Sequence, residues 1–189
     1  SHGDSNTHYS DIDFGIEFHS NYYYRVVEYV NGNANYRTGN AYWNPNSEVF
    51  EVRVNSVGKV EYVKNRVVFY TSTVAPRYPL LVDTSFGSTN SKVDSVYWVH
   101  RNQADKVVWS SMTSLMDTPL SRYNGWGVRA RRGARKGWDQ GATSVLTLGN
   151  PDKYDGTDIY GLSFKPSQAS SAIAVGLAYG NSNGQQNDI

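Results

Sequence analysis

Residues 11–18 read Asp-Ile-Asp-Phe-Gly-Ile-Glu-Phe, an alternation of apolar with polar or small side chains. Side chains along a β-strand point to its two faces in turn, so every second residue shares a face. The apolar residues that fall together are Ile12, Phe14, Ile16 and Phe18. The stretch therefore predicts a half-buried strand, with one face in a core and the other towards solvent.

Further strands are expected along the whole chain, some from alternation and others from short apolar runs, and they are separated by Gly, Pro and Asn turns. They cover residues 22–30, 49–55, 59–64, 67–72, 80–82, 93–99, 107–113, 144–148, 157–164 and 172–178. The three patterns within 47–72 predict a meander, and residues 137–142 are expected to form a loop. No segment has a convincing helical period. The sequence predicts an all-β, antiparallel β-sandwich of the jelly-roll kind.

The composition agrees with a β protein and excludes several classes of function. Among 189 residues there are 15 Tyr, 17 Gly and no Cys, so disulfides and thiolate metal sites are excluded. A net charge of +1 favours neither nucleic acid nor an anionic membrane surface as a partner. No apolar run approaches the ~20 residues that a membrane-spanning helix needs.

The two ends of the chain resemble each other. When Ser1 is set against Ala178, an offset of 178 − 1 = 177 residues, five of twelve positions are identical without a gap, and both copies end on Asp-Ile. We interpret the match as a repeat. The chain then begins and ends inside one repeated motif, and it corresponds to one register-shifted unit of a repeating assembly.

Several segments also resemble a known family, but they occur here in rotated order. They are Asp11–Phe14, Val49–Val54, Tyr70–Thr73, Pro79–Thr84, Gly137–Ser144 and Gly176–Gly180. Together they resemble the concanavalin A-like and SPRY-like sandwich modules of large secreted or surface repeat proteins. This resemblance implies an extracellular or cell-surface location. It also implies that residues 1–100 are the back half of a sandwich, 101–106 a linker, and 107–189 the front half of the same or the next sandwich.

Two features depart from the family pattern. Arg66 stands where the hairpin turn of the family usually has Gly, so we expect an altered turn. The basic stretch 129–136 is an insertion, and it is interpreted equally as a solvated loop or as a patch for an anionic partner.

The rotated order has three explanations: a circularly permuted monomer, a fragment of a tandem array, or a subunit completed by its neighbour. The last gives a head-to-tail polymer of copies of this chain, because a heterologous interface that does not close propagates. The residues expected to join such subunits are Ile12, Phe14, Gly176, Leu177 and Ile189.

Two ligand sites are candidates. Aromatic residues near turns can stack on sugar rings, which makes Tyr42, Trp43 and Trp126 a candidate polysaccharide site, with core packing as the alternative. The carboxylates of Asp4, Asp11 and Asp13 supply the oxygen ligands that Ca²⁺ takes, although turn capping is the favoured interpretation. No other cofactor is expected.

Catalysis has no support in the motifs. The four His residues lack a nucleophile motif, and the five Glu residues form no recognisable acid–base pair. We therefore expect a non-enzymatic structural subunit of an extracellular filament or surface array. The alternative is a lectin-like, carbohydrate-binding adhesion module.

Overall fold

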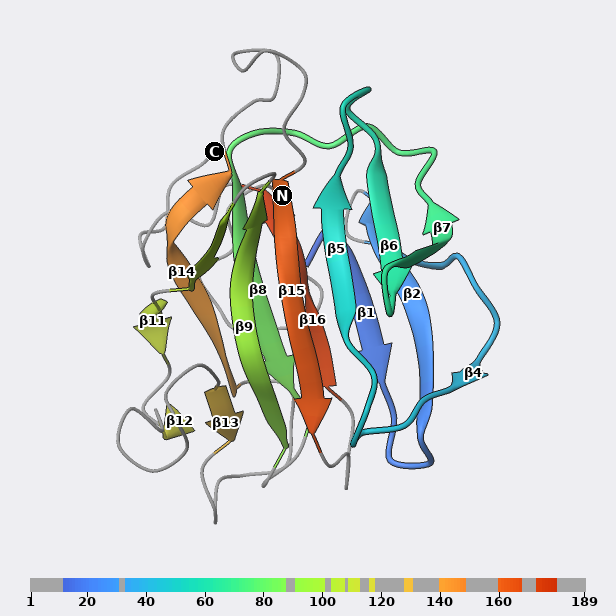
Figure 1. The fold of residues 1–189 in the computed structure, drawn as a ribbon, viewed down its shortest axis with the longest axis vertical. Helices are drawn as coiled ribbons and strands as arrows, with labels where there is room; N and C mark the ends of the chain where they lie inside the picture. Colours follow the sequence, from blue (N-terminus) through green and yellow to red (C-terminus); the bar gives the residue numbers. More distant parts are fainter. Residues whose placement is uncertain are drawn as a thin grey trace.

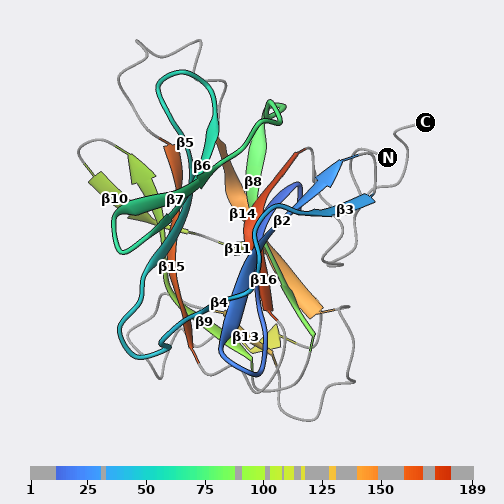
Figure 2. The same cartoon turned by 90° about the vertical axis from the view of Figure 1, so that its right-hand side faces the viewer.

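A computed structural model describes residues 12–30, 33–87, 91–100, 103–107, 109–112, 116–117, 128–130, 140–148, 160–167 and 173–179. These residues form two antiparallel sheets of eight strands each, and none of them lies in a helix. The two sheets face each other as two layers (Figures 1 and 2). The predicted all-β, antiparallel sandwich is confirmed. Among the described residues there is accordingly no helix with the length and apolarity of a membrane span.

The first sheet has the strand order β11-β14-β8-β16-β1-β2-β3, and β4 also pairs with β2. Its strands are β1 (Phe14–Phe18), β2 (Tyr23–Val30), β3 (Asn33–Tyr36), β4 (Ala41–Tyr42), β8 (Leu80–Phe86), β11 (Trp109–Met112), β14 (Gln140–Leu148) and β16 (Ile173–Tyr179). Strand β14 begins at Gln140, so residues 140–142 of the loop expected over 137–142 belong to a strand instead, while 137–139 lie outside the described residues.

The second sheet has the order β12-β13-β9-β15-β5-β6-β7, and β10 also pairs with β9. Its strands are β5 (Phe50–Val54), β6 (Val60–Lys64), β7 (Val67–Thr71), β9 (Lys92–His100), β10 (Gln103–Lys106), β12 (Met116–Asp117), β13 (Val128–Ala130) and β15 (Tyr160–Ser167). The predicted meander is β5-β6-β7. Strand β10 falls in the polar stretch expected as a linker, because main-chain pairing does not require apolar side chains.

The core lies between the sheets and is centred on aromatic rings. Phe18 of the first sheet packs edge-on against Phe50 and Phe164 of the second, with ring centroids 4.9 and 5.9 Å apart. All three side chains are fully buried. Edge-to-face packing suits the quadrupoles of aromatic rings, so these contacts contribute more than apolar burial alone.

Strand β1 differs from its predicted half-buried pattern. All five of its residues are buried, including Glu17, which is 2% exposed and pairs with Arg25. Ile12 does not share the face of Phe14, because the chain bends at Asp13 and the strand begins only after it. The Cγ2 atom of Ile12 instead lies 3.1 Å from the position of a Cβ on Gly15, on the opposite face.

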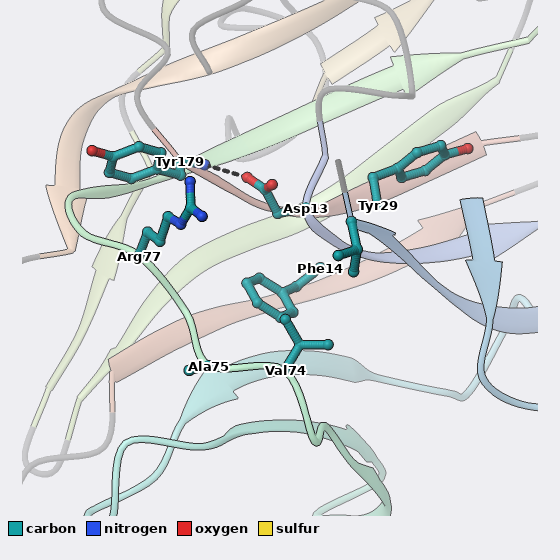
Figure 3. Close-up of a pocket in the computed structure, with 8 residues that line it drawn as sticks. Asp13, Phe14, Tyr29, Val74, Ala75, Arg77 and Tyr179 are labelled. Atoms are coloured by element: carbon teal, nitrogen blue, oxygen red, sulfur yellow. Dashed lines mark hydrogen bonds between the residues drawn. The ribbon is translucent and has the colours of Figure 1, made fainter. Parts of the chain in front are cut away.

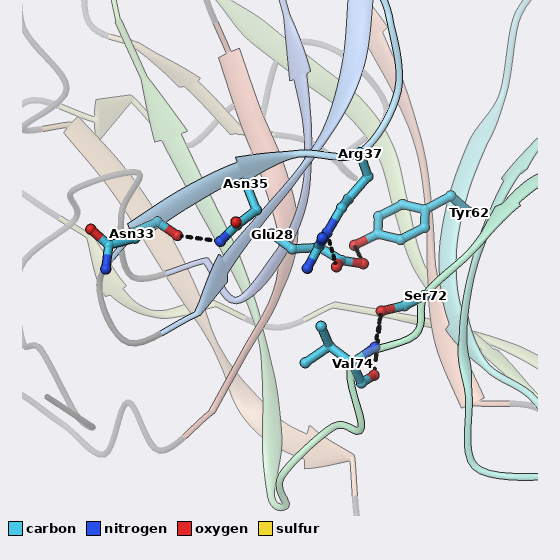
Figure 4. A network of polar contacts seen from close by, with 7 residues as sticks. All are labelled: Glu28, Asn33, Asn35, Arg37, Tyr62, Ser72 and Val74. Atoms are coloured by element: carbon cyan, nitrogen blue, oxygen red, sulfur yellow. Dashed lines mark hydrogen bonds and ion pairs between the residues drawn. The ribbon is translucent and has the colours of Figure 1, made fainter.

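A carboxylate is enclosed between the sheets near β2, β6 and the segment after β3 (Figure 4). Glu28 is fully buried, and it accepts hydrogen bonds from Arg37 Nε at 2.7 Å and from the Tyr62 hydroxyl at 3.2 Å. Burial, together with the nearby charge of Glu28, raises the pKa of Tyr62 well above its ordinary value. A buried charge is stable only when it is paired, and the Arg37 guanidinium supplies the pairing here.

The β6–β7 hairpin keeps the two-residue turn that Arg66 was expected to alter. Asn65 and Arg66 have φ values of 50° and 70°, the left-handed pair that a type I′ turn requires. The expectation of an altered turn is therefore wrong. The arginine adopts the left-handed backbone conformation that glycine adopts more easily, because the strands on both sides fix the register.

We predict that Arg66→Gly raises the free energy of unfolding by about 0.5–1 kcal/mol. A non-glycine residue in the left-handed region costs about 1–2 kcal/mol, and the greater freedom of glycine in the unfolded chain offsets part of the gain. Denaturant unfolding measures the change. Gly58→Ala is the matched control, since Gly58 has φ 73° and alanine there should destabilise. A less stable Arg66→Gly variant would contradict the turn assignment.

Candidate functional site

The most distinctive site is the boundary between the two halves of the chain. We call strands β1–β9 the first half and strands β10–β16 the second half. The two halves alternate in the same way in both sheets. Each main path begins with two strands of the second half, which are followed by one strand of the first half. One more strand of the second half comes next, and three strands of the first half complete the path. In this order β16 lies between β8 and β1, and β15 lies between β9 and β5.

We call β15 and β16 the wedge, and the space between β8/β9 and β1/β5 the slot. Figure 1 shows the two wedge strands in red, one in each layer, with green strands on one side and blue or cyan strands on the other. The wedge thus supplies one strand to each sheet. Without it, both sheets of the first half would be interrupted at the same point.

A glycine marks the boundary in each layer. Gly176 of β16 is paired with Gly15 of β1, and a Cβ atom on Gly176 would lie well inside van der Waals contact of the Phe14 carbonyl oxygen. Gly161 of β15 is paired with Arg53 of β5, and a Cβ there would overlap the Arg53 backbone. The two backbones approach closely only because neither wedge residue has a side chain.

At the end of the β1–β16 boundary, a hydrogen bond between the two strands' ends lies beside a small cleft (Figure 3). The main-chain N–H of Tyr179 donates a hydrogen bond of 2.6 Å to Asp13 Oδ2. The cleft beside it measures about 120 Å³, and its lining includes Phe14, Val74 and Arg77. Sites for small organic ligands usually enclose about 300–1,000 Å³, so the cleft marks the boundary without offering a ligand pocket.

Four of the residues predicted to join subunits lie together at this boundary within one chain, and their role in joining subunits stays a prediction. Phe14 is the register partner of Leu177, and Ile12 packs over Gly176, so these four residues do meet. Ile189 lies outside the described residues. The sequence predicted a strand over 157–164, which overlaps β15, but it did not place this strand or Gly161 at the boundary, because nothing in the repeated ends refers to the second sheet. A glycine inside an apolar strand pattern was the available signal.

The predicted calcium ligands do not form a described cluster. Asp13 holds the Tyr179 main chain, whereas Asp4 and Asp11 lie outside the described residues. Within the part of the chain that the structure describes, no group of three His, Asp or Glu side chains could hold a metal ion. The basic stretch 129–136 lies outside the described residues except for its first two, whose side chains are not described either.

Of the two described residues of the predicted aromatic site, Tyr42 is exposed and Trp43 is buried. Trp43 is only 4% exposed, and its ring packs 5.1 Å from that of Phe18, so it is a core residue and cannot stack on a sugar. Tyr42 is 68% exposed, and its ring lies 4.3 Å from that of Tyr23. Trp126 lies outside the described residues.

An ion-pair cluster stands on the β1 side of the boundary. Glu17, the register partner of Ala174 in β16, accepts a hydrogen bond of 2.8 Å from Arg25 Nε and lies 3.3 Å from His19 Nε2. Burial by itself raises the pKa of the Glu17 carboxyl. The hydrogen bonds and charges of His19 and Arg25 outweigh it, so the pKa lies below its ordinary value of 4.5.

This lowered pKa gives a prediction of acid sensitivity. A group whose pKa falls on folding stabilises the fold above its unfolded-state pKa, and that stabilisation disappears as the pH falls through the lowered value. Glu17→Gln should therefore lower the free energy of unfolding by about 1.5–3 kcal/mol at pH 7. The difference in free energy of unfolding between the variant and the original chain should decrease steadily below pH 4.5. Unfolding curves between pH 3 and pH 7 test it, and a pH-independent difference would contradict the ion-pair assignment.

Comparisons with known proteins add no identification. No protein-family model matches the chain, and no curated protein matches it significantly.

Proposed function

We propose that this chain is a non-enzymatic structural subunit of an extracellular filament or surface array, assembled head-to-tail by completion of half-sandwiches. The observation that carries the proposal is the position of the wedge. Two strands of the second half fill a gap in both sheets of the first half. A protein built as two mutually dependent halves is suited to linking copies, because each half presents unpaired strand edges that only the other half satisfies.

The sequence repeat supports the same proposal independently. At the repeat offset Asp188 and Ile189 correspond to Asp11 and Ile12, the two residues that precede Asp13 and β1. Strand β1 is also the strand that pairs with β16. The repeat relates the segment after β16 to the segment before β1, and the sheet pairs the same two strands. These are separate observations.

The glutamates favour a structural over a catalytic role. The sequence has five Glu residues, and each forms an ion pair with a basic side chain: Glu17, Glu28, Glu48, Glu51 and Glu61. A glycosidase needs two carboxylates facing each other across a substrate groove. These glutamates instead stabilise strands and turns.

Size-exclusion chromatography with electron microscopy tests the proposal over a range of protein concentrations. We expect species at multiples of the 21.1 kDa subunit and, at high concentration, linear assemblies. A single 21.1 kDa species at every concentration would sink the filament proposal and leave a permuted monomer.

A second candidate is carbohydrate binding, which the exposed tyrosines at the β2–β4 edge favour. Tyr22 and Tyr42 are 49% and 68% exposed, and the Tyr42 hydroxyl lies 2.5 Å from that of Tyr23. Tyr22 also has φ 60°, a strained conformation of the kind that occurs at binding sites. Rings fixed in advance lose little entropy when a sugar stacks on them.

Titration with neutral oligosaccharides, followed by tyrosine fluorescence, tests this candidate. We expect Tyr42→Ala to weaken binding at least about fivefold, taking as a guide the ~1–3 kcal/mol that one aromatic ring contributes when a nucleobase stacks on it. The control is Val67→Ala, a residue that is 67% exposed on the other sheet. Equal affinities for both variants, or no binding at millimolar sugar, would exclude the tyrosine site.

A further inference from the structure

We propose that Tyr23 and Tyr42 form an oxidative cross-linking site, at which a peroxidase with hydrogen peroxide joins the two side chains into a dityrosine within one chain. The inference goes beyond the two proposed functions and depends on neither, because it concerns a covalent modification of the chain's own residues. The chain has no Cys, so a disulfide between strands is excluded, whereas its 15 Tyr offer another kind of covalent bond.

The pairing of β2 with β4, at the edge of the first sheet, holds the two rings together (Figure 1). Tyr23 and Tyr42 are direct register partners, so their side chains project from the same face of the sheet. The ring centroids lie 4.3 Å apart with 35° between the ring planes, and the hydroxyl oxygens lie 2.5 Å apart. The ring carbons next to the hydroxyl groups, at which phenoxyl radicals couple, are therefore close together as well.

Exposure selects this pair of tyrosines over another that the structure describes. Tyr42 is 68% exposed and Tyr23 is partly exposed, so an oxidant in solution reaches them. Tyr62 and Tyr70 are also neighbours, with ring centroids 5.7 Å apart. Tyr62 is fully buried, however, and its hydroxyl bonds to Glu28. Coupling needs two accessible rings, and only the pair at the β2–β4 edge combines access with contact.

The coupling removes one electron and one proton from each phenol. The two phenoxyl radicals form a carbon–carbon bond between the ring positions next to their hydroxyl groups. The hydrogen on each of these carbons then moves to the phenolic oxygen, which restores both aromatic rings. Hydrogen peroxide accepts the two electrons and two protons and is reduced to two molecules of water. The rings must turn until the two carbons meet, and the exposed Tyr42 ring has room to turn.

The link would fasten the edge of the first sheet. Strand β4 has only two residues, and β2 is the strand with which it pairs in the described part of the chain. Tyr23 and Tyr42 are 19 positions apart, so the bond closes a loop that contains β3. A bond across such a loop restricts the unfolded chain far more than the folded one. We expect it to raise the Tm by about 5–10 °C.

Peptide mapping of the oxidised chain tests the proposal. The folded 189-residue chain is treated with a peroxidase and hydrogen peroxide in dilute solution and is then digested with trypsin. Cleavage after Lys and Arg separates residues 1–25, which contain Tyr23, from residues 38–53, whose single tyrosine is Tyr42. We expect these fragments to be joined, with the loss of two hydrogen atoms and the appearance of dityrosine fluorescence. The chain should remain a monomer, because groups held in contact react faster than groups on separate molecules.

Conservative variants identify the residues that couple. Tyr23→Phe and Tyr42→Phe should each abolish the joined fragments, because phenylalanine keeps the ring but forms no phenoxyl radical. The matched control is Tyr22→Phe, which removes a neighbouring tyrosine that lies in the same tryptic fragment and is 49% exposed. This control should give the same yield of joined fragments as the original chain. Oxidation should raise the Tm of the original chain and of the control, but not that of Tyr42→Phe.

Three results would overturn the inference. They are the absence of joined fragments, a link that persists in Tyr23→Phe, and covalent dimers as the main product. Each would mean that the contact between Tyr23 and Tyr42 does not direct the coupling. None of these results bears on the filament or the sugar site, because assembly and sugar binding are measured on the unoxidised chain.

Discussion

Phe164→Ala is expected to lower the free energy of unfolding by about 3–5 kcal/mol, the usual cost of deleting a buried phenylalanine side chain. Phe164 is fully buried, and its ring packs 5.9 Å from that of Phe18 and 6.3 Å from that of Phe50. The substitution leaves a cavity between the layers, on the wedge. It removes a contact between the two halves of the chain as well as a part of the core.

Denaturant unfolding measures the loss, with Val67→Ala as the control. Val67 is 67% exposed in β7, so its truncation should change stability by no more than about 0.5 kcal/mol. Phe164→Ala should also reduce the assembly of chains at a given concentration, because the proposed joint between half-sandwiches loses the same contact. A loss of stability below about 1 kcal/mol would mean that the wedge is not seated between the sheets.

Gly176→Ala is expected to destabilise the fold by about 3 kcal/mol, at the upper end of the usual cost of overpacking. The added methyl group would overlap the Phe14 carbonyl oxygen and the Gly15 Cα, which are backbone atoms in the adjacent strand. A flexible side chain could move aside, but β1 is held between β16 and β2 and cannot. The two strands would have to separate at the boundary.

The control is Gly39→Ala, at an exposed glycine with no other atom within 4 Å of an added Cβ. That variant should be neutral or slightly more stable, because alanine reduces the freedom of the unfolded chain. Thermal and denaturant unfolding of the two variants give the comparison. Equal stabilities would contradict the close approach of β1 and β16.

The strands themselves could be predicted from the sequence because their signals are local. Apolar alternation identified β1, and the meander β5-β6-β7 followed from its turns. The burial of Glu17 could not be predicted, since the charge is compensated by Arg25 from the next strand. The burial of Trp43 could not be predicted either, because this residue follows β4 and no local pattern shows that its ring meets Phe18.

The order of strands in the sheets depends on contacts between distant residues. The repeated ends indicated that the start of β1 and the end of β16 belong together, and these strands do pair. Nothing local indicated that β15 lies between β9 and β5. The two sheets have the same order of first-half and second-half strands. This shared order is seen only when the sheets are compared, because each sheet joins strands from widely separated parts of the chain.

The most direct test of the account is the oligomeric mass and stability of a rearranged chain that runs from Gln103 to Ile189 and then directly from Asp13 to His100. This chain joins β16 to β1 through one copy of the repeated motif and adds no residue. We predict a cooperatively folded monomer at least as stable as the original chain, which no longer assembles because wedge and slot now adjoin in sequence. A rearranged chain that fails to fold would contradict the β16–β1 connection on which the account rests.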